Sequence, residues 1–259
     1  MAVDIVPELL RLLRERFGDG IADSKDVKRI TDRIANGTAT LADVHDYSIA
    51  TGESLSQALR EILIPERLPD GRIYWNIADR TIRPLIEQEY NLVNETAEQI
   101  QTIVNESDGI RLEAVRAEFP QGRIHGFLDK LVTDEINQFR WLLEPVINIS
   151  ESFSDDYMMA NADARYKTGL KVSIIRETES AGTRSSHGHK YFIPCDWCSR
   201  LAGEYAYPGV PPAVFQRHES CRCRVTYKNE RQRQNVWSKE IWQTVTPEQR
   251  LSQLRESNE

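Results

Sequence analysis

The sequence predicts an α+β protein that is predominantly α-helical, with a helical N-terminal region followed by a small α/β module. Apolar residues recur at three- and four-residue steps through most of the first 168 positions, which is the period of amphipathic helices. After Gly169 the period shortens to two in Leu170, Val172 and Ile174, as expected of a strand. All four cysteines then lie between positions 195 and 223, so the α/β module is the most chemically concentrated part of the chain.

The composition is that of a soluble globular chain. Its 259 residues can form one large domain or two modest ones, and 40% of them are apolar while 28% are charged. No apolar run approaches the roughly 18 residues of a membrane span, so no membrane association is expected. The first residues, MAVDIVPELLRLLRERFG, have no basic segment ahead of the apolar positions, which favours an amphipathic helix over a secretory signal. A reducing compartment is therefore expected.

Charge is distributed unevenly along the chain. The net charge of -7 argues against a protein that coats nucleic acid over its whole surface. Residues 160–240, however, carry fourteen Lys and Arg against eight Asp and Glu. This basic stretch is either a solvated surface of mixed charge or a surface that meets DNA or an acidic partner.

The first 64 residues predict a bundle of short helices, because apolar positions at helical spacing alternate with capping and stop residues. Thr40 and Asp43 have the spacing of a capping box. The turn Pro69-Asp70-Gly71 is the first candidate boundary after the bundle. The four helices are expected to begin near Ile5, Ser24, Thr40 and Ser54, and to end at Gly18, Gly37, Gly52 and Pro65.

Residues 76–149 predict a region of longer helices. A long helix is expected from 76 to 104, with Pro84 either kinking it or marking its true first turn. A short helix is expected at 110–119 and another at 125–143, which Pro145 stops. Ser152 or Ser154 then caps a helix that ends at Gly169.

The module at 150–228 continues with strands, and a charged C-terminal helix is expected at 229–259. A first strand is predicted at 170–175 and a short one at Tyr205–Tyr207. The returning strand is predicted to include Val214, Phe215 and residues 222–227.

The cysteines have the spacing of metal ligands. Cys195 and Cys198 form a Cys-x-x-Cys pair, and His218, Cys221 and Cys223 follow about twenty residues later as His-x-x-Cys-x-Cys. Two such halves suit a tetrahedral Zn²⁺ ion, whereas two disulfides or four buried thiols are the alternatives. The reducing compartment favours zinc. The favoured ligands are the first four, with Cys223 as the substitute, because alternate residues of a strand share one face. With so many ligands the site is expected to be closed and structural, so that zinc staples the small module.

Catalytic alternatives lack the residues that they need. A zinc deaminase requires an upstream His-x-Glu, which the segment NADARYKTGLKV does not contain. Arg217-His218-Glu219 beside the cysteines suggests a nuclease, but no histidine follows downstream. Cysteine nucleophiles are disfavoured because zinc would occupy the thiolates. The sequence therefore predicts no enzyme activity.

The segments CDWCSRLAGEYAY and VFQRHESCRCRVTY resemble the C-terminal part of tailed-phage head morphogenesis proteins, the minor capsid proteins of the phage Mu protein F and SPP1 types. The shared pattern is Cys-x-x-Cys, then Leu-x-Gly at Leu201–Gly203, then His-x-x-Cys-Arg-Cys from His218. The preceding ANADARYKTGLKVSIIRE is similar to the helix–strand lead-in of that family. The resemblance covers about residues 150–228.

The resemblance implies a minor structural protein of a phage or prophage head. Such a protein associates with the portal and/or the major capsid protein, acts in head morphogenesis or in DNA packaging and ejection, and contacts packaged DNA in some cases. Its expected location is the virion head, and the host cytoplasm during assembly. The alternative function is that of a zinc-containing nucleic-acid-binding protein or nuclease.

Overall fold

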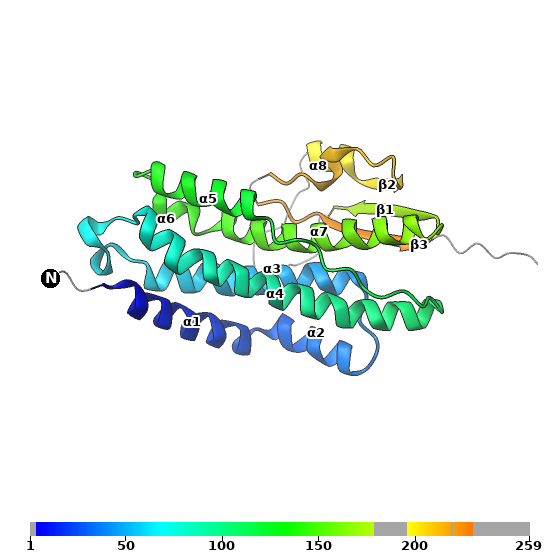
Figure 1. Ribbon diagram of the computed structural model, residues 1–259, viewed down its shortest axis with the longest axis horizontal. Helices are drawn as coiled ribbons and strands as arrows, with labels where there is room; N and C mark the ends of the chain where they lie inside the picture. Colours follow the sequence, from blue (N-terminus) through cyan, green and yellow to red (C-terminus); the bar gives the residue numbers. More distant parts are fainter. Residues whose placement is uncertain (1–3, 179–195, 219, 230–259) are drawn as a thin grey trace, which may run out of the picture. The chain divides into compact units, whose positions relative to one another are not determined.

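The computed structural model describes residues 4–178, 196–218 and 220–229. It is mainly helical with one small antiparallel sheet, which confirms the predicted α+β class. Elements α1 to β3 belong to one compact unit, Met1–Asn229 (Figure 1). The predicted C-terminal helix lies outside the described residues beyond Asn229, where β3 ends. The helices are α1 Val6–Asp23, α2 Lys25–Ala35, α3 Leu41–Ile62, α4 Trp75–Asp108, α5 Gln121–Thr133, α6 Gln138–Trp141, α7 Glu144–Lys167 and α8 Asp196–Leu201.

Three short 3-10 turns and three strands complete the described elements. The turns are η1 Pro65–Arg67, η2 Pro69–Gly71 and η3 Pro212–Phe215. The strands are β1 Val172–Glu177, β2 Gly203–Ala206 and β3 Arg224–Asn229. We call α1 to α7 the helical body, and β1 to β3 with α8 and the loop 216–223 the cysteine module.

Helix α3 is the central element of the helical body. It packs most extensively against α7 and then against α1 and α4, and most of its residues are buried. The predicted capping box starts it: Asp43 accepts hydrogen bonds from the backbone N–H and hydroxyl of Thr40. Two helices separated at Gly52 were predicted here, and that prediction is wrong. A Cβ at Gly52 would lie 2.5 Å from Ser150 Oγ, so this glycine permits close contact with α7 inside one continuous helix.

Glycine and proline signals mark the ends of several helices less reliably than predicted. Helix α1 continues past Gly18 and Gly20 to Asp23, and α4 runs through Pro84, which lies inside it. The predicted second helix is confirmed, since Ser24 accepts a hydrogen bond from the N–H of Val27. Helices α1, α2 and α4 are stable because their apolar faces are buried, even where glycine or proline lowers the local helix propensity.

The predicted helix at 110–119 is absent from the described chain. This segment instead lies against α4 and α7, and side chains of those helices form hydrogen bonds with its backbone groups. The side-chain amide of Asn161 pairs with both the N–H and the carbonyl of Val115, at 2.9 and 2.7 Å. The hydroxyl of Tyr90 donates to the carbonyl of Ala117.

The predicted helix at 125–143 is divided. Helix α5 ends at Thr133, and α6 follows after a turn in which Asp134 accepts from Trp141 Nε1 at 3.1 Å. Pro145 lies in the first turn of α7, so it begins a helix there. The predicted start at Ser152 or Ser154 is therefore wrong, and position 150 lies within α7. Its end is as predicted, with Gly169 in a left-handed conformation.

The sheet has the order β2–β1–β3, and both pairings are antiparallel. Ile174 in the central strand pairs with Tyr205 of β2 and Tyr227 of β3. The strands predicted at 170–175 and 205–207 and the one at 222–227 are thus present with shifted ends. Val214 and Phe215 form η3 instead of a strand. Among the described helices, none is both long and apolar enough to cross a membrane.

Candidate metal centre

Three side chains from two segments meet in the cysteine module. Cys198 lies in α8, and His218 and Cys221 lie in the loop between η3 and β3. Their ligand atoms all lie within 4.8 Å of one another. The Sγ atom of Cys198 is 2.9 Å from His218 Nε2 and 3.8 Å from Cys221 Sγ. A Cys/His cluster that the spacing predicted is therefore formed by the fold.

Cys223 adjoins this group. It is fully buried and forms one buried cluster with Cys198 and Cys221. The structure thus gathers three of the five predicted ligands and buries Cys223 with two of them, while Cys195 lies outside the described residues. The hydrogen bond from Cys223 lowers the pKa of Cys221, and the same contact raises the pKa of Cys223. This contact favours the thiolate form of Cys221, which is the form that binds metal.

The donor set suits a metal ion with tetrahedral coordination by mostly thiolate ligands. With Zn–S bonds of about 2.3 Å, two sulfur ligands of a tetrahedron lie about 3.8 Å apart, and Cys198 and Cys221 have this separation. A sulfur and a histidine nitrogen would lie about 3.6 Å apart. The contact between Cys198 and His218 is shorter, at 2.9 Å, so metal binding would move the imidazole outward.

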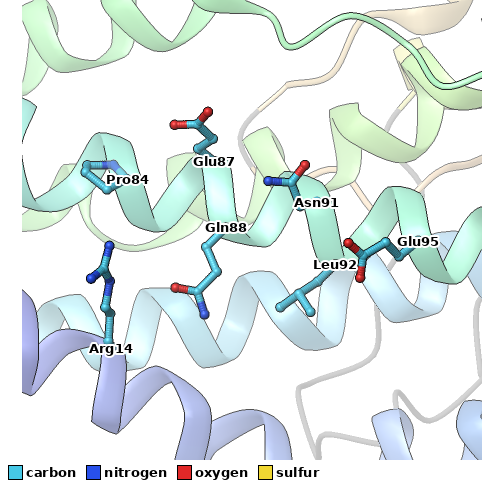
Figure 2. A pocket seen from close by; sticks show the side chains of 7 residues that line it. All are labelled: Arg14, Pro84, Glu87, Gln88, Asn91, Leu92 and Glu95. Atoms are coloured by element: carbon cyan, nitrogen blue, oxygen red, sulfur yellow. The ribbon is translucent and has the colours of Figure 1, made fainter.

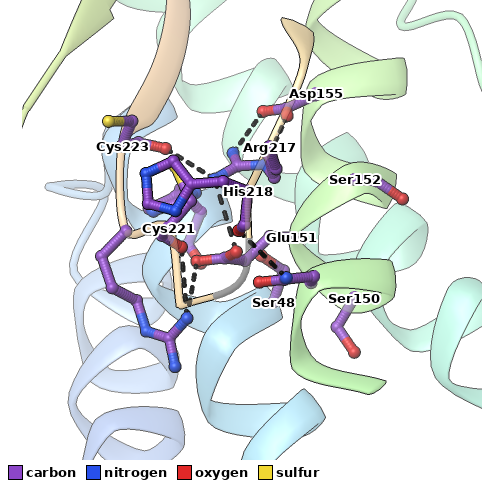
Figure 3. A network of polar contacts seen from close by, with 12 residues as sticks. Ser48, Ser150, Glu151, Ser152, Asp155, Arg217, His218, Cys221 and Cys223 are labelled. Carbon is purple, nitrogen blue, oxygen red and sulfur yellow. Dashed lines mark hydrogen bonds and ion pairs between the residues drawn. The ribbon is translucent and has the colours of Figure 1, made fainter. Parts of the chain in front are cut away.

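The loop that carries the ligands also carries arginines that face the helical body. Arg217 makes a two-pronged ion pair with Asp155 of α7 at 2.7 and 2.8 Å, and both side chains are almost fully buried. Figure 3 shows Arg217 pointing toward Asp155 and Glu151 of α7, beside His218 and Cys221. Arg222 and Arg224 extend this pattern, pairing with Glu144 of α7 at 2.9 Å and Asp46 of α3 at 2.8 Å.

We call the contact between the arginines 217, 222 and 224 and the acidic residues of α3 and α7 the seam. Further buried ionisable groups lie around it. Burial raises the pKa of Glu151 to about 8, although Arg217 and Arg222 lower it in part. Burial also lowers the pKa of His45 well below its ordinary value, and Arg217 and Arg224 add to that effect. His45 is 2% exposed on α3. The seam is therefore a dry, charged interface whose groups depend on one another.

The sequence reasoning missed Arg176 of β1. Its guanidinium is 1% exposed and lies 3.6 Å from Cys221 Sγ and 3.9 Å from Cys198 Sγ. A basic residue in a strand that is otherwise buried was the available signal, because a buried charge needs a partner. The partners of Arg217 were also missed, since Asp155 is 62 residues away and no local motif links them.

Two hollows lie on the helical body. One, of 440 Å³, lies between α1 and α4, and its lining has no cysteine or histidine but consists of Arg14, Glu87, Gln88, Asn91 and Glu95 with the apolar Pro84 and Leu92 (Figure 2). The other, of 730 Å³, adjoins the loop 216–223 and is lined by residues of α5, α6 and α7, by residues of the turn between α5 and α6, and by Arg217. Its cations are Arg123, Lys130, Arg140 and Arg217, and its carboxylate is Asp134. It is linked to the candidate site through Asn148, which donates to the carbonyl of His218 at 3.2 Å.

No protein-family model, no curated protein and no solved structure matches this chain.

Proposed function

We propose that the Cys/His cluster binds one Zn²⁺ ion and that the ion is structural. The observation that carries the proposal is the group of buried Cys198 and Cys221 with half-buried His218, whose ligand atoms lie within 4.8 Å of one another, and Cys223 is buried with the two cysteines. Four donors from this group complete a tetrahedron and leave no position for a reacting water. The sheet is small, and beside its apolar residues the module buries sulfur and arginine, so an ion would hold together the part that apolar packing does not.

Elemental analysis of the purified chain tests the zinc site. We expect one zinc per chain, with loss of zinc in His218→Ala. His125→Ala is the matched control, because His125 is exposed on α5 and its imidazole lies 3.4 Å from Asp129, away from the cluster. A folded wild-type chain without zinc, or equal zinc loss in both variants, would contradict the proposal.

We further propose that the chain is a minor structural protein of a tailed-phage or prophage head, associated with the portal and/or the major capsid protein. The support is the resemblance of residues 150–228 and the position of the shared Leu-x-Gly motif in the fold. Leu201 ends α8 and Gly203 begins β2, so the shared Leu-x-Gly joins the first cysteine half to the sheet. In this role the protein acts in head morphogenesis, or in DNA packaging and ejection, and resides in the virion head.

Co-expression with the portal and major capsid proteins of the same genome tests this function. We expect the tagged portal or capsid protein to capture the wild-type chain at stoichiometry above background. Mass spectrometry of purified heads should then find the chain in few copies. Absence from both the captured complexes and the heads would contradict the proposal.

A second candidate function, nucleic-acid binding, is favoured by the cationic 730 Å³ hollow. Lys130 there lies 5.9 Å from the centre of the Trp141 ring, a pairing of cation and aromatic that suits a phosphate and a base. DNA binding that weakens with salt and weakens further in Lys130→Ala, but not in Lys28→Ala of α2, would support it. Plasmid cleavage that depends on metal and on His218 would instead indicate a nuclease.

A further inference from the structure

We propose that Arg176 is the counter-charge and positioning residue of the zinc centre, and that it favours a ligand set of three cysteines and His218. The inference rests on the proposed zinc site. It adds a residue that lies outside every metal-binding motif in the sequence, and it addresses which of His218 and Cys223 can be spared.

Arg176 is placed at the centre of the module by the sheet. It lies on the central strand β1, opposite Val225 of β3 and Gly203 of β2. Its side chain is among the largest fully buried ones of the described chain. The guanidinium also lies 5.4 Å from the ring centre of Trp197, which precedes Cys198 in α8.

One guanidinium contacts each described segment that supplies a ligand. Through Nη1, Arg176 donates to the carbonyls of Val214 and Gln216, which precede His218, the second of them at 3.0 Å. Through Nη2 it approaches the sulfurs of Cys198 and Cys221 at 3.9 and 3.6 Å. The planar fork of an arginine can make both sets of contacts at once, whereas the single ammonium of a lysine cannot.

The sulfurs are the anionic partners of this cation. Among the described residues no carboxylate lies within ion-pair distance of Arg176, although its side chain is excluded from water. A buried cation without a partner is costly, and thiolates are the negative groups within reach. Hydrogen bonds from outside the ligand set are also the usual means by which a protein orients and tunes metal ligands.

Charge balance then favours the mixed ligand set. Zn²⁺ with three thiolates and one neutral imidazole carries one net negative charge, which a single guanidinium cancels. Zn²⁺ with four thiolates carries two, and one of these would stay uncompensated by Arg176 in a buried site. His218 is therefore the retained ligand, and one of the cysteines is spared.

Arg165 provides a matched control. It is another fully buried arginine, on α7, and it donates to the side-chain oxygen of Asn105 at 2.5 Å and lies 4.9 Å from the ring centre of Tyr227. Its replacement removes a buried arginine from the same compact unit without touching a cysteine. A loss of stability is therefore expected in the Arg165 and the Arg176 variants alike, whereas a loss of zinc affinity is expected only in the Arg176 variants.

The test is zinc affinity measured by competition with a chelator for the full chain, alongside thermal unfolding. We expect Arg176→Met to lower the affinity about 10- to 100-fold. Arg176→Lys, which keeps the charge and loses the fork, should recover part of it, and Arg165→Met should stay within roughly threefold of the wild type. If Arg176→Met does not fold, the comparison of Arg176→Lys with Arg165→Lys gives the same answer.

Unchanged affinity in both Arg176 variants would overturn the inference, and so would an equal loss in the Arg165 variant. Either result would leave the zinc proposal intact, because the wild type would still bind the ion. A wild-type chain that binds no zinc would instead remove both proposals.

Discussion

The helical body and the cysteine module fill their centres with opposite chemistry. The body is built on aliphatic and aromatic side chains that form one continuous cluster, which extends into the sheet through Val172, Ile174, Val225 and Tyr227. The module adds to this cluster a second buried group of three cysteines, with the buried guanidinium of Arg176 beside it. Apolar packing stabilises a helix bundle without a ligand. A group of thiols and a guanidinium gains stability when its charges are matched, so we expect the cysteine module to depend on the proposed ion and the helical body not to depend on it.

Breaking the metal centre should have the largest effect on this contrast. We expect Cys198→Ser to remove hydrogen-exchange protection from residues 196–229, while α1 and α2 keep theirs. Helix α7 should lose protection only near Glu151 and Asp155, which face the loop arginines. Treating the wild type with a zinc chelator should give the same pattern. Unchanged protection at Ile174 and Val225 in both experiments would contradict the contrast.

Breaking the seam between the two regions should come next. Asp155→Ala leaves the nearly buried Arg217 without its two-pronged partner, and removing one member of such a pair costs about 3–5 kcal/mol of the free energy of unfolding. The neighbouring Asp156 is the matched control, because it pairs with Arg123 at the surface. We expect Asp156→Ala to cost at most about 1 kcal/mol in urea unfolding. Equal costs would show that the seam is no tighter than the surface.

Glu89 of α4 is a buried ionisable group within the helical body, and it sharpens the comparison. Glu89 is fully buried, and burial raises its pKa to about 8 from an ordinary value of 4.5. Between these two values the folded chain keeps a proton that the unfolded chain has lost, so the contribution of Glu89 to stability is lost as pH rises.

Glu89→Gln removes this pH dependence. The variant should gain roughly 4 kcal/mol over the wild type at pH 8 and almost nothing at pH 4.5, as followed by urea unfolding across that range. Glu87→Gln, at an exposed position of the same helix, should show no such trend. A gain that is constant with pH would refute the assignment of a neutral Glu89.

The smallest expected effect concerns the contact of α3 with α7. A methyl group at Gly52 would meet Ser150 Oγ at 2.5 Å, so Gly52→Ala should cost about 2 kcal/mol. A methyl group added at Gly18 in α1 would have no other atom within 4 Å. There, Gly18→Ala should stabilise the chain by about 0.5–1 kcal/mol, because alanine favours a helix. Thermal unfolding that shifts in the same direction for both would contradict the close packing.

Sequence patterns predicted the helices from their apolar spacing, and misjudged them where tertiary contact overrides local signals. Gly52 has the identity of a helix end, but its role is to admit Ser150 of a helix that lies about a hundred residues later. The segment at 110–119 has helical periodicity, yet Asn161 supplies the hydrogen bonds that a helix would have made internally. Neither contact can be inferred from the residues around it.

The candidate site was predictable to the extent that its ligands are close in sequence. The spacing of Cys198, His218 and Cys221 was sufficient to predict the cluster. Arg176 and Asp155 could not be assigned to it, because they reach it from β1 and α7 through the topology of the chain. Ligand spacing is a local property of the chain, whereas charge balance is a property of the fold.

X-ray absorption at the zinc edge, recorded on the purified full chain, tests the central claim most directly. We expect one zinc per chain with about three sulfur neighbours near 2.3 Å and one nitrogen neighbour near 2.0 Å. A spectrum with only oxygen and nitrogen neighbours, or a chain that folds with its cysteines in disulfides and no zinc, would contradict the account.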